Sequence, residues 1–147
     1  MFKGDLMPKI TMVSEMLEED LEYIGEQLHL YNRNAAPSTL RKHAIDVHLA
    51  IKDEEGHVYG GLIGKIYRFC LYIDTLWMDE SIRGCGFGSQ LIDEAERIAR
   101  NEKCTFIHLD TFSFQAPEFY ERKGFEVFGL LDGYPEGIKR YYLKKNL

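Results

Sequence analysis

A segment with three glycines in five positions, Gly84-Cys85-Gly86-Phe87-Gly88, constrains this 147-residue chain more than any other feature. It follows an aromatic and β-branched run, Phe69–Met78, which is typical of a strand. Apolar residues at helical spacing come after it: Leu91, Ile92, Ala95, Ile98 and Ala99. Glycines between a strand and a helix let backbone N–H groups converge on one point, where the helix dipole adds partial positive charge. The segment therefore predicts an anion-binding loop of the kind that holds phosphate.

Two common phosphate-binding motifs do not fit this loop. The last glycine of a Gly-x-Gly-x-x-Gly fingerprint would fall at Ser89 when counted from Gly84, and at Leu91 when counted from Gly86. No Gly-Lys-Ser or Gly-Lys-Thr follows, so the loop lacks the lysine and the hydroxyl of a Walker motif. The register thus disfavours both a dinucleotide-binding fold and ATP hydrolysis.

The rest of the pattern predicts an α+β fold. One amphipathic helix with an acidic outer face is expected near the start, from its apolar positions Leu17, Leu21, Ile24, Leu28 and Tyr31. A hairpin is expected around the turn 53–56, because residues 47–52 alternate and Val58 resumes an extended pattern. Short strands are expected near 106–109, 125–128 and 138–143, with a short helix between Pro117 and Gly124. This order predicts one layer of sheet with helices packed on it.

Composition narrows the class of protein. With 45% apolar residues and 29% charged residues, the chain is expected to form one globular domain over residues 1–147. A net charge of −6 argues against nucleic acid as a partner. No run reaches the ~18 apolar residues of a membrane span, and charge interrupts residues 1–5, so the predicted location is cytoplasmic and not in a membrane.

Metal ligands are not spaced as a metal site requires. The three cysteines, Cys70, Cys85 and Cys104, form no Cys-x-x-Cys pair, and no His-Glu-x-x-His motif is present. We therefore expect reduced thiols and no bound metal.

Two motifs together resemble a known family. Arg83-x-x-Gly86-x-Gly88 matches the Arg/Gln-x-x-Gly-x-Gly/Ala signature of the GNAT superfamily of N-acetyltransferases, and the segment 116–125, Ala-Pro-Glu-Phe-Tyr-Glu-Arg-Lys-Gly-Phe, resembles that superfamily's Ala-x-x-hydrophobic-Tyr-Glu-x-x-Gly-Phe segment. The chain resembles a small bacterial-type member from about Val47 to Lys144. The resemblance implies a mixed, mostly antiparallel central sheet of about six to seven strands flanked by helices, with splayed strands four and five.

The resemblance also implies an acetyl-CoA site. In such a site the backbone amides of the loop would hold the pyrophosphate, from Arg83, Gly84, Cys85, Gly86, Phe87 and Gly88. The Arg83 side chain and the Ser89 hydroxyl would add contacts, and Met78 N–H would donate to the thioester carbonyl. Ser113 stands where relatives often carry an asparagine that contacts the pantetheine arm.

Catalytic roles follow from the same resemblance. Tyr120 matches the tyrosine that protonates the departing thiolate, although a tyrosine there can also simply pack on the sheet. Asp74 is the candidate base for the incoming amine, and a solvent-facing aspartate is the alternative. Asp110 or a water relay is the other choice of base, but Asp110 also suits a cap for the turn after it.

The implied activity is direct transfer of an acetyl group from acetyl-CoA to a primary amine of a small molecule or peptide, in a ternary complex. Transfer from a longer acyl-CoA and a non-catalytic role as a CoA-binding sensor or interaction protein are the alternatives. Exposed sheet edges are compatible with a homodimer, but nothing in the sequence fixes the oligomeric state.

Overall fold

The computed structural model describes residues 8–40 and 43–147, so the charged first five residues lie outside the described part. It divides into two compact units, one ending at Ser38 and one spanning Thr39–Leu147. The expectation of one domain over 1–147 stays a prediction. Within the described ranges, no helix combines the length and the apolar character that crossing a bilayer requires.

The helices and strands match the predicted order. They are α1 (Glu18–Ala35), a 3-10 turn (Ser38–Leu40), β1 (Ile45–Lys52), β2 (Val58–Tyr67), β3 (Cys70–Met78), a 3-10 turn (Glu80–Ile82), α2 (Phe87–Asn101), β4 (Phe106–Phe112), α3 (Pro117–Arg122), β5 (Glu126–Leu131), a 3-10 turn (Pro135–Gly137) and β6 (Arg140–Asn146).

The first unit contains α1, the helix predicted near the start. Its first turn is acidic, and Asp20 accepts a hydrogen bond from the Leu17 N–H at 2.9 Å, which satisfies one unpaired amide of the helix start. Arg33 lies in the last turn, where a cation interacts favourably with the helix dipole.

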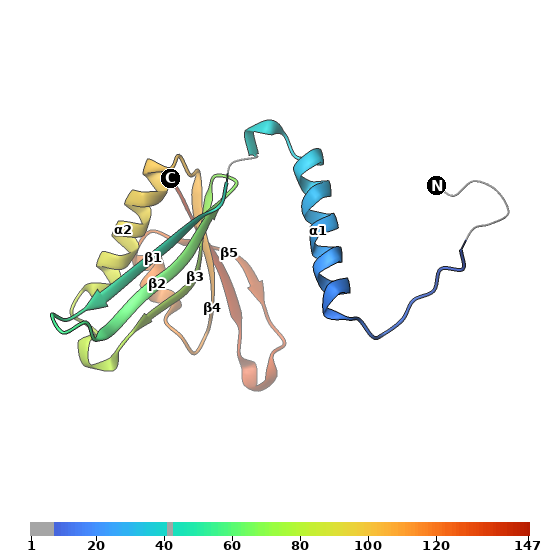
Figure 1. Ribbon diagram of the computed structural model, residues 1–147. Coiled ribbons are helices and arrows are strands. Elements are labelled where there is room, and N and C mark those ends of the chain that lie inside the picture. Colours follow the sequence, from blue (N-terminus) through green and yellow to red (C-terminus); the bar gives the residue numbers. More distant parts are fainter. Residues whose placement is uncertain (1–7, 41–42) are drawn as a thin grey trace. The chain divides into compact units, whose positions relative to one another are not determined.

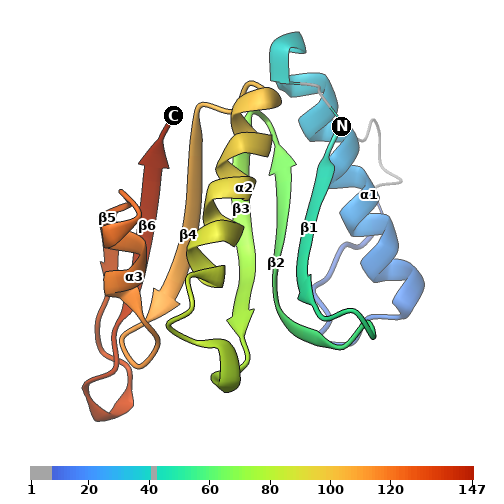
Figure 2. The same cartoon turned by 90° about the vertical axis from the view of Figure 1, so that its left-hand side faces the viewer.

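The second unit is a six-stranded sheet in the order β1-β2-β3-β4-β6-β5. Among the described strands, only β3 and β4 run parallel, and α2 makes the crossover between them. Figures 1 and 2 show α2 lying along one face of the sheet, with α3 over the same face nearer β6 and β5. The mixed, mostly antiparallel sheet predicted from the sequence is confirmed.

The core lies between α2 and this face of the sheet. The apolar stripe of α2 buries Leu91, Ile92, Ala95 and Ala99. Buried strand residues meet it, among them Leu62, Leu71, Ile107 and Leu143. Each fully buried Leu or Ile side chain contributes roughly 1.5–3 kcal/mol relative to an exposed one, so this seam fixes where the start of α2 stands.

β3 and β4 separate at one end, as expected for the strands that the superfamily numbers four and five. They pair only from Cys70 to Tyr72, opposite Phe106 to His108. Just beyond, Asp74 forms a β-bulge, because Ile63 of β2 pairs with Thr75 and the next residue, Gly64, pairs with Ile73. A bulge bends its strand and increases the local twist. The bulge therefore lies where β3 turns away from β4.

Candidate active site

A cavity of about 740 Å³ opens at the separated ends of β3 and β4. Three segments line it: the end of β3 (Leu76–Met78), the loop and first turn of α2 (Gly86–Ser89, with Ile82–Gly84), and residues of the β4–α3 turn and α3, including Phe114 and Tyr120. The strand separation thus places the two sequence motifs around one space.

The backbone of the loop needs glycine at two positions. Gly84 has φ +77° and Gly86, the N-cap of α2, has φ +87°, both in the left-handed region that other residues rarely adopt. The loop is also tied at its start, since Asp79 accepts a hydrogen bond from Ser81 N–H at 2.9 Å. The glycine pattern is therefore a backbone requirement of the loop.

The first turn of α2 offers a set of hydrogen-bond donors. The N–H groups of Phe87, Gly88 and Ser89 precede the first intrahelical bond, which runs from Gln90 to Gly86 at 3.1 Å. No described residue accepts a hydrogen bond from any of the three. Unpaired amides at a helix N-terminus, at the rim of the cavity, fit the oxygens of a pyrophosphate.

Met78 presents its amide to the gap between the strands. The next residue, Asp79, donates its N–H to Tyr59 O of β2 at 2.7 Å. Because successive residues of an extended strand direct their N–H groups to opposite sides, the Met78 N–H is directed away from β2 and toward the β4 side. That orientation suits a donor to a carbonyl oxygen bound in the cavity.

Tyr120 lines the cavity from α3 and packs against the hydrophobic core. Its ring makes edge contacts with Phe119 at 5.2 Å and with Phe125 at 5.9 Å between centroids. No described residue hydrogen-bonds its hydroxyl. Burial raises the pKa of Tyr120 to about 12, so the phenol keeps its proton at neutral pH. A protonated, unpaired hydroxyl at a cavity wall is able to donate a proton there.

The two candidate carboxylates differ in their partners. Asp110 accepts two hydrogen bonds from Arg140, at 2.6 and 2.9 Å, and one from the Tyr72 hydroxyl at 3.1 Å. The hydrogen bonding to Asp110, more than any other interaction, raises the pKa of the Arg140 guanidinium. Asp74 is exposed and accepts from the adjacent Thr75 hydroxyl at 3.1 Å. Of the two, Asp74 is the carboxylate without a cationic partner among the described residues.

Neither carboxylate lines the cavity, and two other residues expected at the site, Cys85 and Ser113, do not line it either. Cys85 is exposed, and its thiol lies 3.9 Å from Arg83 O. Ser113 exchanges hydrogen bonds with Lys139: its N–H donates to Lys139 O at 2.8 Å and its hydroxyl accepts from Lys139 N–H at 3.0 Å. Both side chains therefore serve the loop backbone around the cavity.

Sequence reasoning assigned no site role to several residues of the cavity wall, among them Trp77, Phe114 and Gln115. Trp77 and Phe114 are large apolar side chains, 48% and 69% exposed, that line the same cavity. Gln115 accepts hydrogen bonds from Phe112 N–H and the Thr111 hydroxyl at 2.8 and 2.9 Å and holds the β4–α3 turn. No local sequence pattern marks these three residues.

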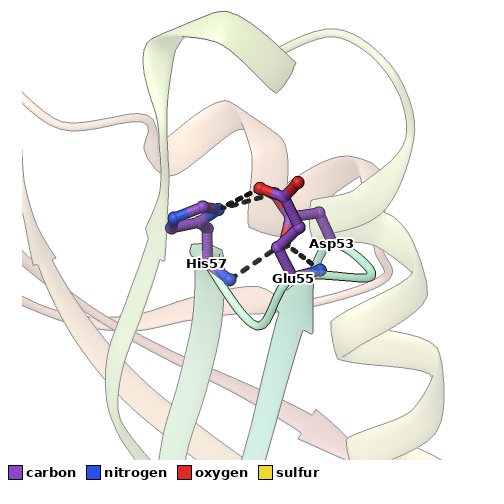
Figure 3. A group of neighbouring side chains, drawn as sticks. All are labelled: Asp53, Glu55 and His57. Atoms are coloured by element: carbon purple, nitrogen blue, oxygen red, sulfur yellow. Dashed lines mark hydrogen bonds and ion pairs between the residues drawn. The ribbon is translucent and has the colours of Figure 1, made fainter.

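A separate cluster of ionisable side chains lies in the β1–β2 turn: Asp53, Glu55 and His57, all exposed (Figure 3). One Asp53 oxygen accepts the N–H groups of Glu55 and His57, both at 2.9 Å, and the other lies 3.0 Å from His57 Nδ1. These bonds, first of all that from the His57 backbone, lower the pKa of Asp53. We assign the cluster to the hairpin turn, whose geometry its hydrogen bonds account for.

Comparison with known proteins agrees with this geometry. The model of the acetyltransferase (GNAT) family matches residues 10–125. A blasticidin-S acetyltransferase of Streptomyces morookaense is 42% identical over 64% of this chain and 70% of that protein. An acetyltransferase of Agrobacterium fabrum is 34% identical over 68% of this chain and 73% of that protein.

A solved structure has the same fold over nearly the whole chain. It is the crystal structure of an acetyltransferase from Bacillus cereus, 38% identical, with a TM-score of 0.88 over 93% of this chain and 98% of that one. Members of the family use acetyl-CoA as the acetyl donor. By its two motifs, its separated strands and the extent of these matches, the chain belongs to the GNAT family of acetyltransferases and is an acyltransferase enzyme.

Proposed function

We propose that the enzyme transfers acetyl directly from acetyl-CoA to the primary amine of a small molecule, in a ternary complex. The observation that carries this proposal is the cavity itself. Three kinds of group surround it: the unpaired first-turn amides of α2, which suit phosphate, the Met78 N–H of β3 and the protonated Tyr120 hydroxyl. Similarity to a blasticidin-S acetyltransferase supports a small-molecule acceptor rather than a protein.

Each proposed role follows from a contact described above. Bound acetyl-CoA would supply an acetyl group activated as a thioester. The first-turn amides of α2 hold its pyrophosphate, and Met78 N–H donates to the thioester carbonyl oxygen as negative charge develops there. Tyr120 gives its proton to the sulfur as the carbon–sulfur bond breaks.

The incoming amine must lose a proton, because an ammonium group has no lone pair for attack on the thioester. Asp74 is the proposed acceptor of that proton, directly or through water. It stands at the bulge beside the strand gap and, unlike Asp110, it has no guanidinium partner in the described structure. The acceptor amine and its acetylated product would both bind at the end where β3 and β4 separate.

A thiol-release assay tests the proposal. Purified enzyme and acetyl-CoA are mixed with a panel of amines that includes blasticidin S, a polyamine, an amino acid and a peptide. Release of CoA that depends on a small-molecule amine supports the proposal, whereas release with the peptide alone contradicts it. Parallel reactions with a longer acyl-CoA test the acyl preference. Faster turnover with the longer acyl-CoA would make it, and not acetyl-CoA, the proposed donor.

Substitution of the tyrosine tests the acid. Tyr120→Phe is expected to lower kcat by about 10²-fold, the usual magnitude for a general acid. Tyr141→Phe is the matched control, since Tyr141 also packs against the core but does not line the cavity. Equal rates for the wild type and Tyr120→Phe, at every pH tested, would remove Tyr120 from the mechanism.

A further inference from the structure

A lysine at a variable position of the second sequence motif reaches Ser89 at the phosphate end of the cavity. Lys123 is the C-cap of α3, 34 residues after Ser89, and its side chain is only 19% exposed. Its ammonium group donates to the Ser89 hydroxyl at 2.7 Å and to the Asp93 carboxylate at 2.6 Å. Ser89 lines the cavity at the third position of α2.

The direction of the Lys123–Ser89 hydrogen bond is fixed by chemistry. An ammonium group has no acceptor lone pair, so the Ser89 oxygen must accept and its own hydrogen is left for another partner. In the described part of the chain, no group accepts a hydrogen bond from the Ser89 hydroxyl. Beside the unpaired amides of the same helical turn, an anionic oxygen in the cavity is the natural acceptor for that hydrogen.

We infer that Lys123 is a positioning residue for the cofactor: it orients the Ser89 hydroxyl as a donor to the CoA pyrophosphate and places a positive charge behind it. Asp93 faces the same ammonium group and holds it at the start of α2. Lys123 is also the C-cap of α3, and its N–H donates to Phe119 O and Tyr120 O. The same residue therefore affects both phosphate binding and the position of Tyr120. The inference rests on the use of CoA and not on the acceptor or the acid proposed above.

Binding measurements without an acceptor test the inference. Titration calorimetry with CoA is expected to give a dissociation constant about tenfold higher for Lys123→Met than for the wild type, because a charge-assisted hydrogen bond is lost. Lys123→Arg keeps the charge and a donor and is expected to restore affinity to within about threefold. In ³¹P NMR of bound CoA, the pyrophosphate resonances should shift between the wild type and Lys123→Met, while the 3′-phosphate resonance stays in place.

Two further variants separate positioning from packing. Lys145→Met is the matched control: Lys145 is also a partly buried lysine between α2 and the sheet, but it bonds Glu96 and Lys123 O and not the cavity wall. Its CoA affinity should stay within about twofold of the wild type, the scatter expected for a site without ligand contact. In a Ser89→Ala background, Lys123→Met should cost less than about twofold, since the two residues act through one hydrogen bond.

Several results would overturn the inference: wild-type affinity in Lys123→Met, an equal loss in Lys145→Met, or the full tenfold loss in the Ser89→Ala background. A failure of the proposed function looks different. If the wild type binds CoA and responds to these substitutions but acetylates no amine, the acceptor proposal fails and Lys123 keeps its role. If the wild type does not bind CoA, the cofactor assignment and this inference both fail.

Discussion

The Nε of Arg83 donates a hydrogen bond to the carbonyl oxygen of Met78 at 3.2 Å, so the side chain that opens the glycine motif fastens the loop to the end of β3. Arg83→Met removes this bond and is expected to raise the KM for acetyl-CoA by about five- to tenfold, with a smaller effect on kcat. Arg83→Gln keeps an N–H donor, so its KM for acetyl-CoA should lie between those of the wild type and Arg83→Met. Steady-state kinetics at saturating acceptor measures both constants, and a loss confined to kcat would contradict the fastening role.

Loss of the negative charge should lower activity at Asp74 but lower stability at Asp110. Asp74→Asn is expected to lower kcat/KM by about 10²-fold, as for a lost general base, and to change the melting temperature little because the side chain is exposed. If the rate persists, Asp74 is not the base.

Asp110→Asn should act on stability instead. It leaves the Arg140 guanidinium without its carboxylate, on a strand pair where Asp110 is 17% exposed, so thermal unfolding is expected several degrees lower. Turnover at saturating substrates should stay within about threefold, since the proposed chemistry does not use Asp110. A large loss of turnover with an unchanged melting temperature would make Asp110 the base.

Tyr120 should make the fold sensitive to alkali. An unfolded chain ionises tyrosine near pH 10, whereas burial raises the pKa of Tyr120 to about 12. The folded state therefore favours the neutral phenol, and this stabilisation is complete below about pH 10 and is lost as the pH rises toward 12. Urea unfolding at pH 8, 10 and 11 should show a smaller decline for Tyr120→Phe than for the wild type. Tyr72, whose pKa burial also raises, contributes to the decline that remains.

Gly86→Ala tests the conformation of the loop. At φ +87° an alanine is strained by about 1 kcal/mol, although no atom lies within 4 Å of its added Cβ. We expect a lower free energy of unfolding and weaker CoA binding, both from a shifted loop. Gly25→Ala, inside α1 and equally free of neighbours, should not weaken CoA binding. Wild-type affinity in Gly86→Ala would mean that the loop does not set the phosphate donors.

Local patterns predicted the elements well because their periodicity depends on near neighbours in the chain. The apolar stripe of α2 and the glycines before it are such signals, and so is Pro117 at the first turn of α3. The strand boundaries shifted by a few residues where pairing decides the ends: β6 begins at Arg140, opposite Phe112 and Leu131, and not at Ile138.

What the sequence could not predict depends on contacts between distant residues. The hydrogen bond from Lys123 to Ser89 spans 34 positions, and the pair of Arg140 and Asp110 spans 30. Neither pair has a spacing that a helix or a hairpin would mark. The bulge at Asp74 arises only when β3 is matched against β2, so the alternation of β3 alone does not reveal it.

That bulge makes the register of β3 as important as its composition. Before it, Leu71 and Ile73 face the core; after it, Leu76 and Met78 pack there, an odd number of residues later. If β3 kept all its residues but paired with β2 without the bulge, strict alternation would act as a frameshift in space: Trp77 would turn toward α2, and the amide of Met78 would turn toward β2. An enzyme with every proposed side chain would then lose its carbonyl donor through the register of one strand alone.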